Sequence, residues 1–306
     1  MNKIKKKIML LSLLLMTSLN TIGDTTRSEE TVSISESDIL DEQDIEHGDY
    51  VLQGITMIDD YIAVTAYNDD CSINSKLMLY TTDFEFVKEI ELYNSSHVGG
   101  ITYDDKHEII WLTDVAGKIS GYRKDELLYK NNNKPLYEKL DVSRDLVNIY
   151  GNTAVAYICY HDDTLYLGDY TLEDFSTMKS YEIHDDGSIN PDEYKKYKFF
   201  GLVQGLSFFE ENGTTYMCAS SSISRVFKSD IKICKFDPTI DNYRDAHYIN
   251  MALPNMLEQV YVDDAHNLYT VYESNSEKYK RSFKTSSDIV SIDLDEVIEE
   301  SITKVM

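Results

Sequence analysis

The sequence predicts an all-β protein folded as a single β-propeller. One pattern recurs along its 306 residues: a small or polar anchor, an aliphatic residue, a short strand, an acidic turn and a second apolar strand. The five copies start at positions 53, 99, 156, 204 and 258, so the intervals are 46, 57, 48 and 54 residues. A unit of this length made of strands and turns cannot bury both its faces alone, whereas a ring of such units can. The 24 tyrosines and only four prolines also favour sheet.

Each copy begins with a hairpin of short β-branched and aromatic runs that turn at paired acidic residues, which tolerate the turn backbone. The predicted inner hairpins are 55–58 with 61–67, 101–103 with 109–112, 157–160 with 164–167, 206–209 with 214–219, and 260–262 with 268–272. Predicted outer strands are 76–80, 86–92, 118–122, 178–183, 231–236, 246–249 and 289–294. Five four-stranded blades are the preferred count. Six is the runner-up, if the 57-residue interval or the N-terminal segment contains another sheet.

The N-terminal 49 residues differ in composition from the repeats. Residues 1–23 read as a signal peptide, because Lys3 and its lysine neighbours precede an apolar stretch at 8–19, which is shorter than the roughly 20 residues that span a bilayer. An uncleaved membrane anchor is the alternative. Residues 24–49 carry ten acidic residues, one arginine and no aromatic residue, which predicts a disordered acidic stalk with 31–35 as a candidate closing strand. The propeller domain is expected at 50–306, secreted or on the cell surface.

The charge of the mature chain is strongly negative. Without residues 1–23 it has 25 basic and 54 acidic residues, a net charge of −29. Such a surface repels phosphate backbones and anionic lipid, which excludes nucleic acid as a partner and limits membrane contact to an uncleaved N-terminal segment. A cationic small molecule or protein ligand is favoured.

The four cysteines, Cys71, Cys159, Cys218 and Cys234, are too sparse for a disulfide scaffold. Cys218 and Cys234 flank a predicted turn, so either a disulfide between them or two buried free thiols fits the sequence. The spacing typical of structural zinc sites is absent.

The geometry of a β-propeller predicts where polar residues of the repeat meet to form a site. The first strand of each blade lines the central channel and the second runs antiparallel to it, so the start of strand one and the end of strand two share one face. Polar residues at these places should meet around one mouth. They are Gln53, His97, Gln204 and Glu258 at strand-one starts, Tyr67, Asp114, Asp169, Ser220 and Glu273 at strand-two ends, and Arg225 just beyond the same end.

The chemistry of this mouth has several interpretations. His97 is a candidate general base or metal ligand, or it bonds a neighbouring carbonyl group. Four carboxylates are candidate ligands for Ca²⁺ or a similar divalent cation, which prefers oxygen: Asp114, Asp169, Glu258 and Glu273. Alternatively these carboxylates receive a cationic ligand, or Arg225 neutralises one of them and the group joins the blades.

The region 50–294 resembles the gluconolactonase-like and YVTN-type bacterial propellers. The resemblance rests on Gln53-Gly54-Ile55 and His97-Val98-Gly99-Gly100-Ile101-Thr102-Tyr103-Asp104. It implies a secreted or periplasmic propeller, and in some members a metal-dependent lactonase. Those lactonases place a metal-binding glutamate before a glycine where this chain has Gln53, and their asparagine and aspartate ligands have no matching phrases here.

Three functions follow from the sequence. The first is binding of a small ligand or partner at the mouth without turnover. The second is a metal-dependent, lactonase- or esterase-like hydrolase in which carboxylates hold the cation and His97 transfers a proton. The third is a protein-interaction scaffold that uses the blade rim.

Overall fold

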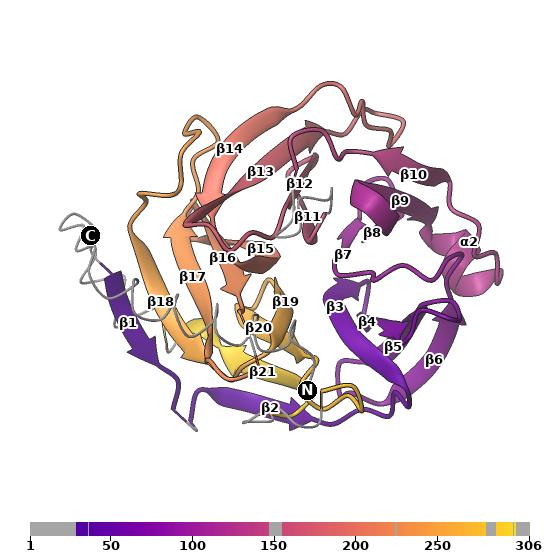
Figure 1. Cartoon of the computed structure of the whole chain (residues 1–306), viewed down its shortest axis with the longest axis horizontal. Helices are drawn as coiled ribbons and strands as arrows, with labels where there is room; N and C mark the ends of the chain where they lie inside the picture. The colour runs from indigo at the N-terminus through magenta and orange to yellow at the C-terminus, as the bar shows by residue number, and fades with distance from the viewer. Residues whose placement is uncertain are drawn as a thin grey trace, which may run out of the picture.

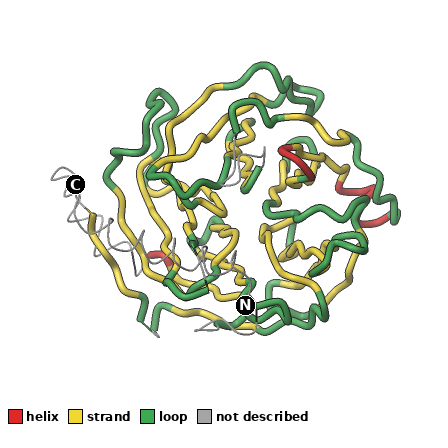
Figure 2. The backbone as a smooth tube through the Cα atoms, viewed as in Figure 1, coloured by secondary structure: helices red, strands yellow, loops and turns green. Residues whose placement is uncertain are grey.

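The computed structural model describes residues 29–35, 37–146, 155–223, 225–279, 286–295 and 297. The predicted signal peptide at 1–23 lies outside these residues. Nearly all regular structure is strand (Figure 2), and none of the helices in the described ranges is long and apolar enough to cross a membrane.

Five sheets surround a central axis, and β3, β7, β11, β15 and β19 lie innermost (Figure 1). Blade 1 comprises β3 (Tyr50–Ile58), β4 (Tyr61–Asn68), β5 (Lys76–Thr81) and β6 (Phe86–Glu91). Blade 2 comprises β7 (Ile101–Asp104), β8 (Ile109–Thr113), β9 (Lys118–Arg123) and β10 (Tyr137–Asp141), with the short helices η1 (Val115–Gly117) and α2 (Lys124–Tyr129). Blade 3 comprises β11 (Tyr157–His161), β12 (Thr164–Gly168), β13 (Phe175–Glu182) and β14 (Lys195–Phe200).

Blade 4 comprises β15 (Val203–Glu211), β16 (Thr214–Ser221), β17 (Ser229–Lys235) and β18 (Tyr248–Leu253). Blade 5 comprises β19 (Leu257–Val262), β20 (Asn267–Tyr272), β21 (Ile289–Asp293) and, from the other end of the chain, β2 (Ile39–Gln43). The prediction of five four-stranded blades is therefore confirmed.

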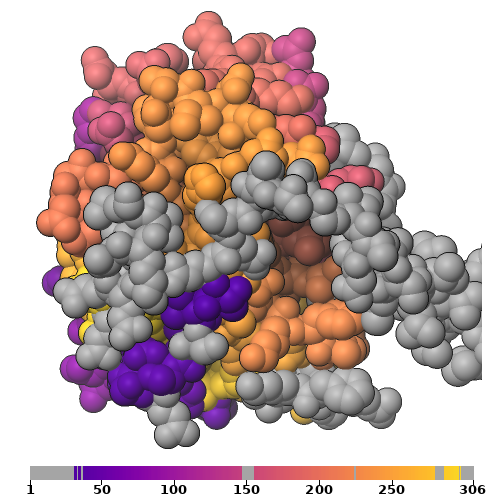
Figure 3. All heavy atoms as spheres, turned by 90° about the vertical axis from the view of Figure 1, so that its left-hand side faces the viewer, coloured from indigo at the N-terminus to yellow at the C-terminus, as the bar shows by residue number. Residues whose placement is uncertain are grey.

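The segment expected as a stalk contributes two strands. β2 pairs antiparallel with β21 and completes blade 5, while β1 (Glu29–Ser33) pairs in parallel with β18 and adds a fifth strand to the sheet of blade 4. Figure 3 shows the indigo N-terminal residues lying against this side of the ring. The sheets of the propeller therefore include residues before position 50, where we expected the domain to begin. The composition of this segment does not show that it forms strands. It forms them because open sheet edges offer hydrogen bonds to β1 and β2, and because Val32 and Ile39 pack against the core.

Hydroxyl side chains join neighbouring blades at equivalent positions of the repeat. Thr102 Oγ1 accepts a hydrogen bond of 2.8 Å from the Tyr160 amide of the next blade, and Ser207 Oγ accepts one of 3.0 Å from the Val262 amide. The inner strands also approach closely at Gly54, where a methyl group would lie 2.8 Å from Ile101 Cγ2 of blade 2. The repeat therefore encodes the contacts between blades as well as the blades.

Gln259 bridges two blades that are not neighbours. It lies on β19 of blade 5, yet its Oε1 accepts from the amide of Ile101 on β7 of blade 2 at 2.8 Å, and its Nε2 donates to the Ile101 carbonyl at 2.6 Å. Both side chains are buried. Because the free edge of an inner strand has no strand partner, the amide of Gln259 takes that place and crosses the channel below the mouth.

The predicted possibility of a Cys218–Cys234 disulfide is wrong, since both thiols are free. Met217 pairs with Cys234, and Cys218 pairs with Ile233, so the two cysteines are diagonal neighbours on opposite faces of one sheet. The alternative, two buried free thiols, is confirmed.

We expect one reactive thiol in the native protein and four after unfolding. Cys71 is exposed, whereas burial removes the other three from reagent and raises the pKa of the Cys159, Cys218 and Cys234 thiols. Titration with a chromogenic disulfide reagent, before and after denaturation without reductant, measures this. Two thiols in the unfolded chain would show a disulfide and contradict the structure.

Candidate ligand site at the channel mouth

Two glutamates of blade 5 form a buried carboxyl pair at the mouth. Glu258 lies on β19 and Glu273 directly follows β20, its antiparallel neighbour, so strand pairing brings the two side chains together. Burial raises the pKa of Glu258 well above its usual range, and the adjacent Glu273 raises it further. Burial also raises the pKa of Glu273 to about 7. The raised pKa values and the interaction between the two carboxyl groups favour a proton shared by the pair.

Glutamines from both neighbouring blades reach this pair. Gln53 Nε2 of blade 1 donates to Glu273 Oε2 at 3.1 Å, and Gln204 Nε2 of blade 4 lies 3.4 Å from Glu258 Oε1. Gln53 is fully buried, and its Oε1 has no hydrogen-bond partner among the described residues. An acceptor of this kind is costly to leave unpaired, which indicates that a donor belongs beside it.

Aromatic rings and two cations surround the pair. The Tyr67 and His97 ring centroids lie 4.3 Å apart. Lys278 Nζ lies 3.0 Å from the Tyr67 hydroxyl, and the Arg225 guanidinium lies 4.5 Å from the centre of the Tyr279 ring. Both cations lower the pKa of Glu273, but burial outweighs them. The mouth therefore combines titratable, aromatic and cationic groups within one small volume.

His97 is neutral at this site. Desolvation by the surrounding protein, together with the positive charge of Lys278, lowers the pKa of His97. The side chain keeps a large solvent-accessible surface. In the described part of the chain, no carboxylate bonds to His97, so it lacks the partner that a histidine base commonly has.

The structure places the other predicted carboxylates in local roles. Asp114 Oδ2 accepts from Asn94 Nδ2, in the connection between blades 1 and 2, at 2.8 Å and from Ser120 Oγ on β9 at 2.7 Å. Asp169 Oδ1 accepts from the Thr177 amide at 2.8 Å. Across the described residues, the four predicted metal ligands do not gather into one coordinating group.

Of the two remaining predicted residues, Ser220 has a local structural role, whereas Arg225 lies at the mouth. Ser220 Oγ donates to the backbone carbonyl of Glu258 at 2.5 Å and so supports the strand that carries the carboxyl pair. Arg225 lies at the mouth, as its position after strand two implies, and stacks on Tyr279.

Sequence reasoning missed Lys278 and Tyr279. Both lie in the long connection after β20, which starts at the mouth end of blade 5. Arg225 is predicted from its position just beyond the second strand of blade 4. Lys278 and Tyr279 lie in the corresponding connection beyond the second strand of blade 5, so the same rule extends to them.

Two cavities lie elsewhere. One of 540 Å³ is bordered by β2, β18 and β21, and one of 690 Å³ lies beside the outer strands of blade 3. Neither contains the titratable residues of the mouth.

The fold and this site define the chain as a five-bladed β-propeller with a titratable polar channel mouth. No model of a known protein family matches the sequence, and no curated protein matches it. Solved propellers are similar to it in fold. The WD40 repeats of RRP9 are 9% identical with a TM-score of 0.45, and the match covers 85% of this chain and 98% of that one.

Two bacterial structures are similar at the same level. A gluconolactonase from Xanthomonas campestris is 10% identical with a TM-score of 0.43, over 83% of this chain and 87% of that chain. A protein of unknown function from Bacteroides thetaiotaomicron is 13% identical with a TM-score of 0.41, over 87% and 74%. Likenesses of this size concern the fold alone.

Proposed function

We propose that this protein is a binding propeller that captures a small amine-bearing ligand at the channel mouth, without chemical turnover. The observation that supports this proposal is the buried pair Glu258 and Glu273, accompanied by the unpaired Oε1 of Gln53. A primary ammonium group carries three donors, and these three side chains supply three acceptors. A cation between the carboxylates also removes their mutual repulsion.

The surrounding groups restrict the ligand further. The Tyr67 ring already carries a cation, since Lys278 Nζ lies 4.8 Å from its centroid. Lys278 and Arg225 already bring two positive charges, of which Lys278 is paired with Asp69 at 3.1 Å. A ligand with one ammonium group therefore suits the site better than a polyamine, and an anionic group elsewhere on the ligand would be attracted by Arg225.

The proposal is tested by calorimetric titration with ethanolamine, glycine and putrescine, beside ethylene glycol as a neutral match for ethanolamine. We expect a monoamine to bind and ethylene glycol not to bind. Because the ammonium group displaces the shared proton of the pair, up to one proton is released at pH 7, which titrations in two buffers of different ionisation enthalpy measure. The Glu273→Gln variant should weaken binding at least tenfold, whereas the exposed Glu138→Gln control should not.

Equal binding of the alcohol and the amine, or binding that survives Glu273→Gln unchanged, would reject this function.

A hydrolase is the second candidate, because a carboxyl group with a pKa of about 7 suits general acid and base catalysis. In this alternative Glu273 moves the proton, and a divalent cation, if one takes part, binds at the pair. Hydrolysis of lactones and esters, assayed with and without Ca²⁺, tests it. Activity that persists in Glu273→Gln would rule out this role for Glu273.

A further inference from the structure

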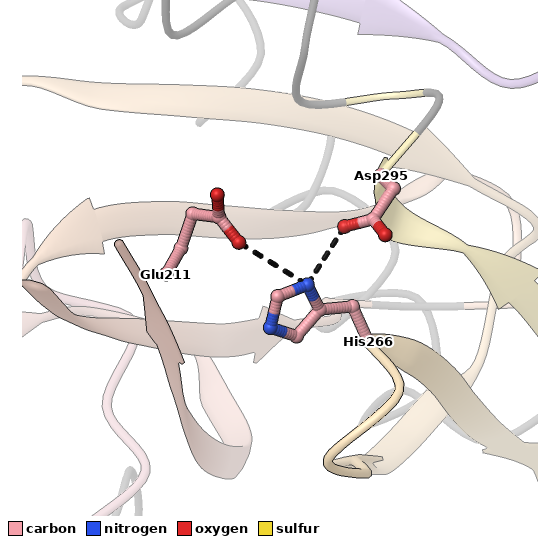
Figure 4. A group of neighbouring side chains, drawn as sticks. All are labelled: Glu211, His266 and Asp295. Atoms are coloured by element: carbon pink, nitrogen blue, oxygen red, sulfur yellow. Dashed lines mark hydrogen bonds and ion pairs between the residues drawn. The ribbon is translucent and has the colours of Figure 1, made fainter. Parts of the chain in front are cut away.

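Three side chains converge on the face opposite the mouth (Figure 4). Glu211 ends β15 of blade 4, His266 lies in the β19–β20 turn of blade 5, and Asp295 follows β21. His266 Nδ1 lies 2.7 Å from Asp295 Oδ1 and 3.4 Å from Glu211 Oε2. Within the described ranges, this is the one group of three or more His, Cys, Asp and Glu side chains whose ligand atoms all lie within 4.8 Å of one another.

The hydrogen bonding of His266 points its lone pair at the two carboxylates. Its Nε2 lies 2.8 Å from the backbone carbonyl oxygen of Glu210. A carbonyl oxygen can only accept, so Nε2 carries a proton, and in the neutral imidazole Nδ1 is then unprotonated. That nitrogen faces two anionic oxygens, an arrangement that is repulsive unless a positive charge occupies the space between them. The occupant is either a metal ion or a second proton on the ring.

The surroundings hold the imidazole as metal-binding histidines are commonly held. Such ligands donate their other ring N–H to a carbonyl or carboxylate group, as His266 does to Glu210. The ring also packs edge-on against Phe209, with centroids 5.5 Å apart, which limits its rotation. His266 and Glu211 are half-buried, whereas the Asp295 side chain is 60% exposed and free to adjust.

One of the two spacings from His266 Nδ1 fits a tetrahedral ion. Zinc bonds of about 2.0–2.2 Å to nitrogen and oxygen place neighbouring ligand atoms roughly 3.4 Å apart. The separation of 3.4 Å between His266 Nδ1 and Glu211 Oε2 already matches that value. Asp295, at 2.7 Å, has to withdraw by less than an ångström, which its exposed position permits.

We propose that Glu211, His266 and Asp295 bind a divalent transition metal ion of the zinc type, with a fourth position open to solvent. One imidazole nitrogen and two carboxylates suit Zn²⁺, whereas Ca²⁺ takes six to eight oxygen ligands. The ion ties a turn of blade 4 to a turn of blade 5 and to the residues after β21. The site is independent of the mouth, since its ligands come from the opposite ends of the strands.

The test is calorimetric titration of the chelator-treated, dialysed full chain with ZnCl₂ at pH 7.5, together with thermal unfolding. We expect one ion per chain, a higher unfolding temperature with zinc, and no comparable effect of CaCl₂. Affinity should rise between pH 6 and 8 because protons compete with the metal for Nδ1. His266→Gln, Glu211→Gln and Asp295→Asn should each weaken binding at least tenfold.

Two controls separate this site from others. His184→Gln changes an exposed histidine beside Asp185 and Asp186, and Glu138→Gln changes an exposed glutamate of blade 2; both should bind zinc as the wild type does. If only a proton occupies His266 Nδ1, an equimolar amount of zinc leaves the unfolding temperature unchanged, which overturns the proposal. Zinc binding that is equal in the wild type and the three ligand variants also overturns it, since it would then reflect the acidic surface in general.

Discussion

The Gln259→Met variant is expected to lower the free energy of unfolding by about 2–6 kcal/mol, because it leaves two buried backbone groups without partners. The glutamine amide makes both of its hydrogen bonds to Ile101, across the channel from blade 5 to blade 2. Methionine keeps the unbranched shape and similar volume of glutamine, so the packing term is small. The amide and the carbonyl of Ile101 are then unpaired, and each unpaired group costs about 1–3 kcal/mol.

Urea unfolding measures this effect, and Gln204→Met is the matched control. Gln204 lies at a similar height on the inner strand of blade 4, but it is partly accessible to solvent and makes one long contact of 3.4 Å with Glu258. We expect its replacement to cost less than about 1 kcal/mol. Equal losses in the two variants would show that the cross-channel bridge contributes nothing beyond an ordinary glutamine.

The carboxyl pair is expected to make the protein less stable as the pH rises. The folded-state pKa of Glu273 is about 7 and that of Glu258 is also raised, both mainly by burial, against the ordinary glutamate pKa of 4.5 in the unfolded chain. Between these values the folded state binds more protons than the unfolded state, so the contribution of the pair to stability is fully present below pH 4.5 and is lost as the pH rises through the folded-state values.

The double variant Glu258→Gln, Glu273→Gln isolates this contribution. The difference in free energy of unfolding between variant and wild type at pH 4.5 is the baseline. By pH 8 this difference should change in favour of the variant by at least about 2 kcal/mol, a value that allows for the partial exposure of Glu273. Chemical unfolding across this pH range measures it. The exposed Glu138→Gln variant should follow the wild-type curve. A difference that stays constant with pH would show that folding raises the pKa of neither carboxyl group.

The part of the site that could be predicted from sequence depends on strand polarity. Gln53, His97 and Glu258 at strand-one starts, and Tyr67 and Glu273 at strand-two ends, lie at the mouth because antiparallel hairpins bring these ends to one face. The rule does not say what each side chain does there. Asp114 and Asp169 occupy equivalent positions, yet nearby donors bond to them, Asn94 in the connection after β6 and Thr177 on β13.

Other features depend on distances that no repeat encodes. The reach of Gln259 to Ile101 requires the narrow channel of a five-bladed ring, and the pairing of β2 with β21 requires an open edge near the start of the chain. Glu211, His266 and Asp295 are 55 and 29 residues apart, and only the packing of blade 4 against blade 5 brings them together.

The sequence by itself determined the class of fold and the number of blades. The alternation of apolar and polar residues, the turn residues and the repeat length are local properties that recur in every unit. It also determined which end of each hairpin carries varied polar residues. Only the tertiary structure decided which of these residues meet, which are buried, and how their charges couple. Those outcomes depend on the closure of the ring, which sets the distances between residues far apart in the chain and the burial that shifts the pKa values of Glu258 and Glu273.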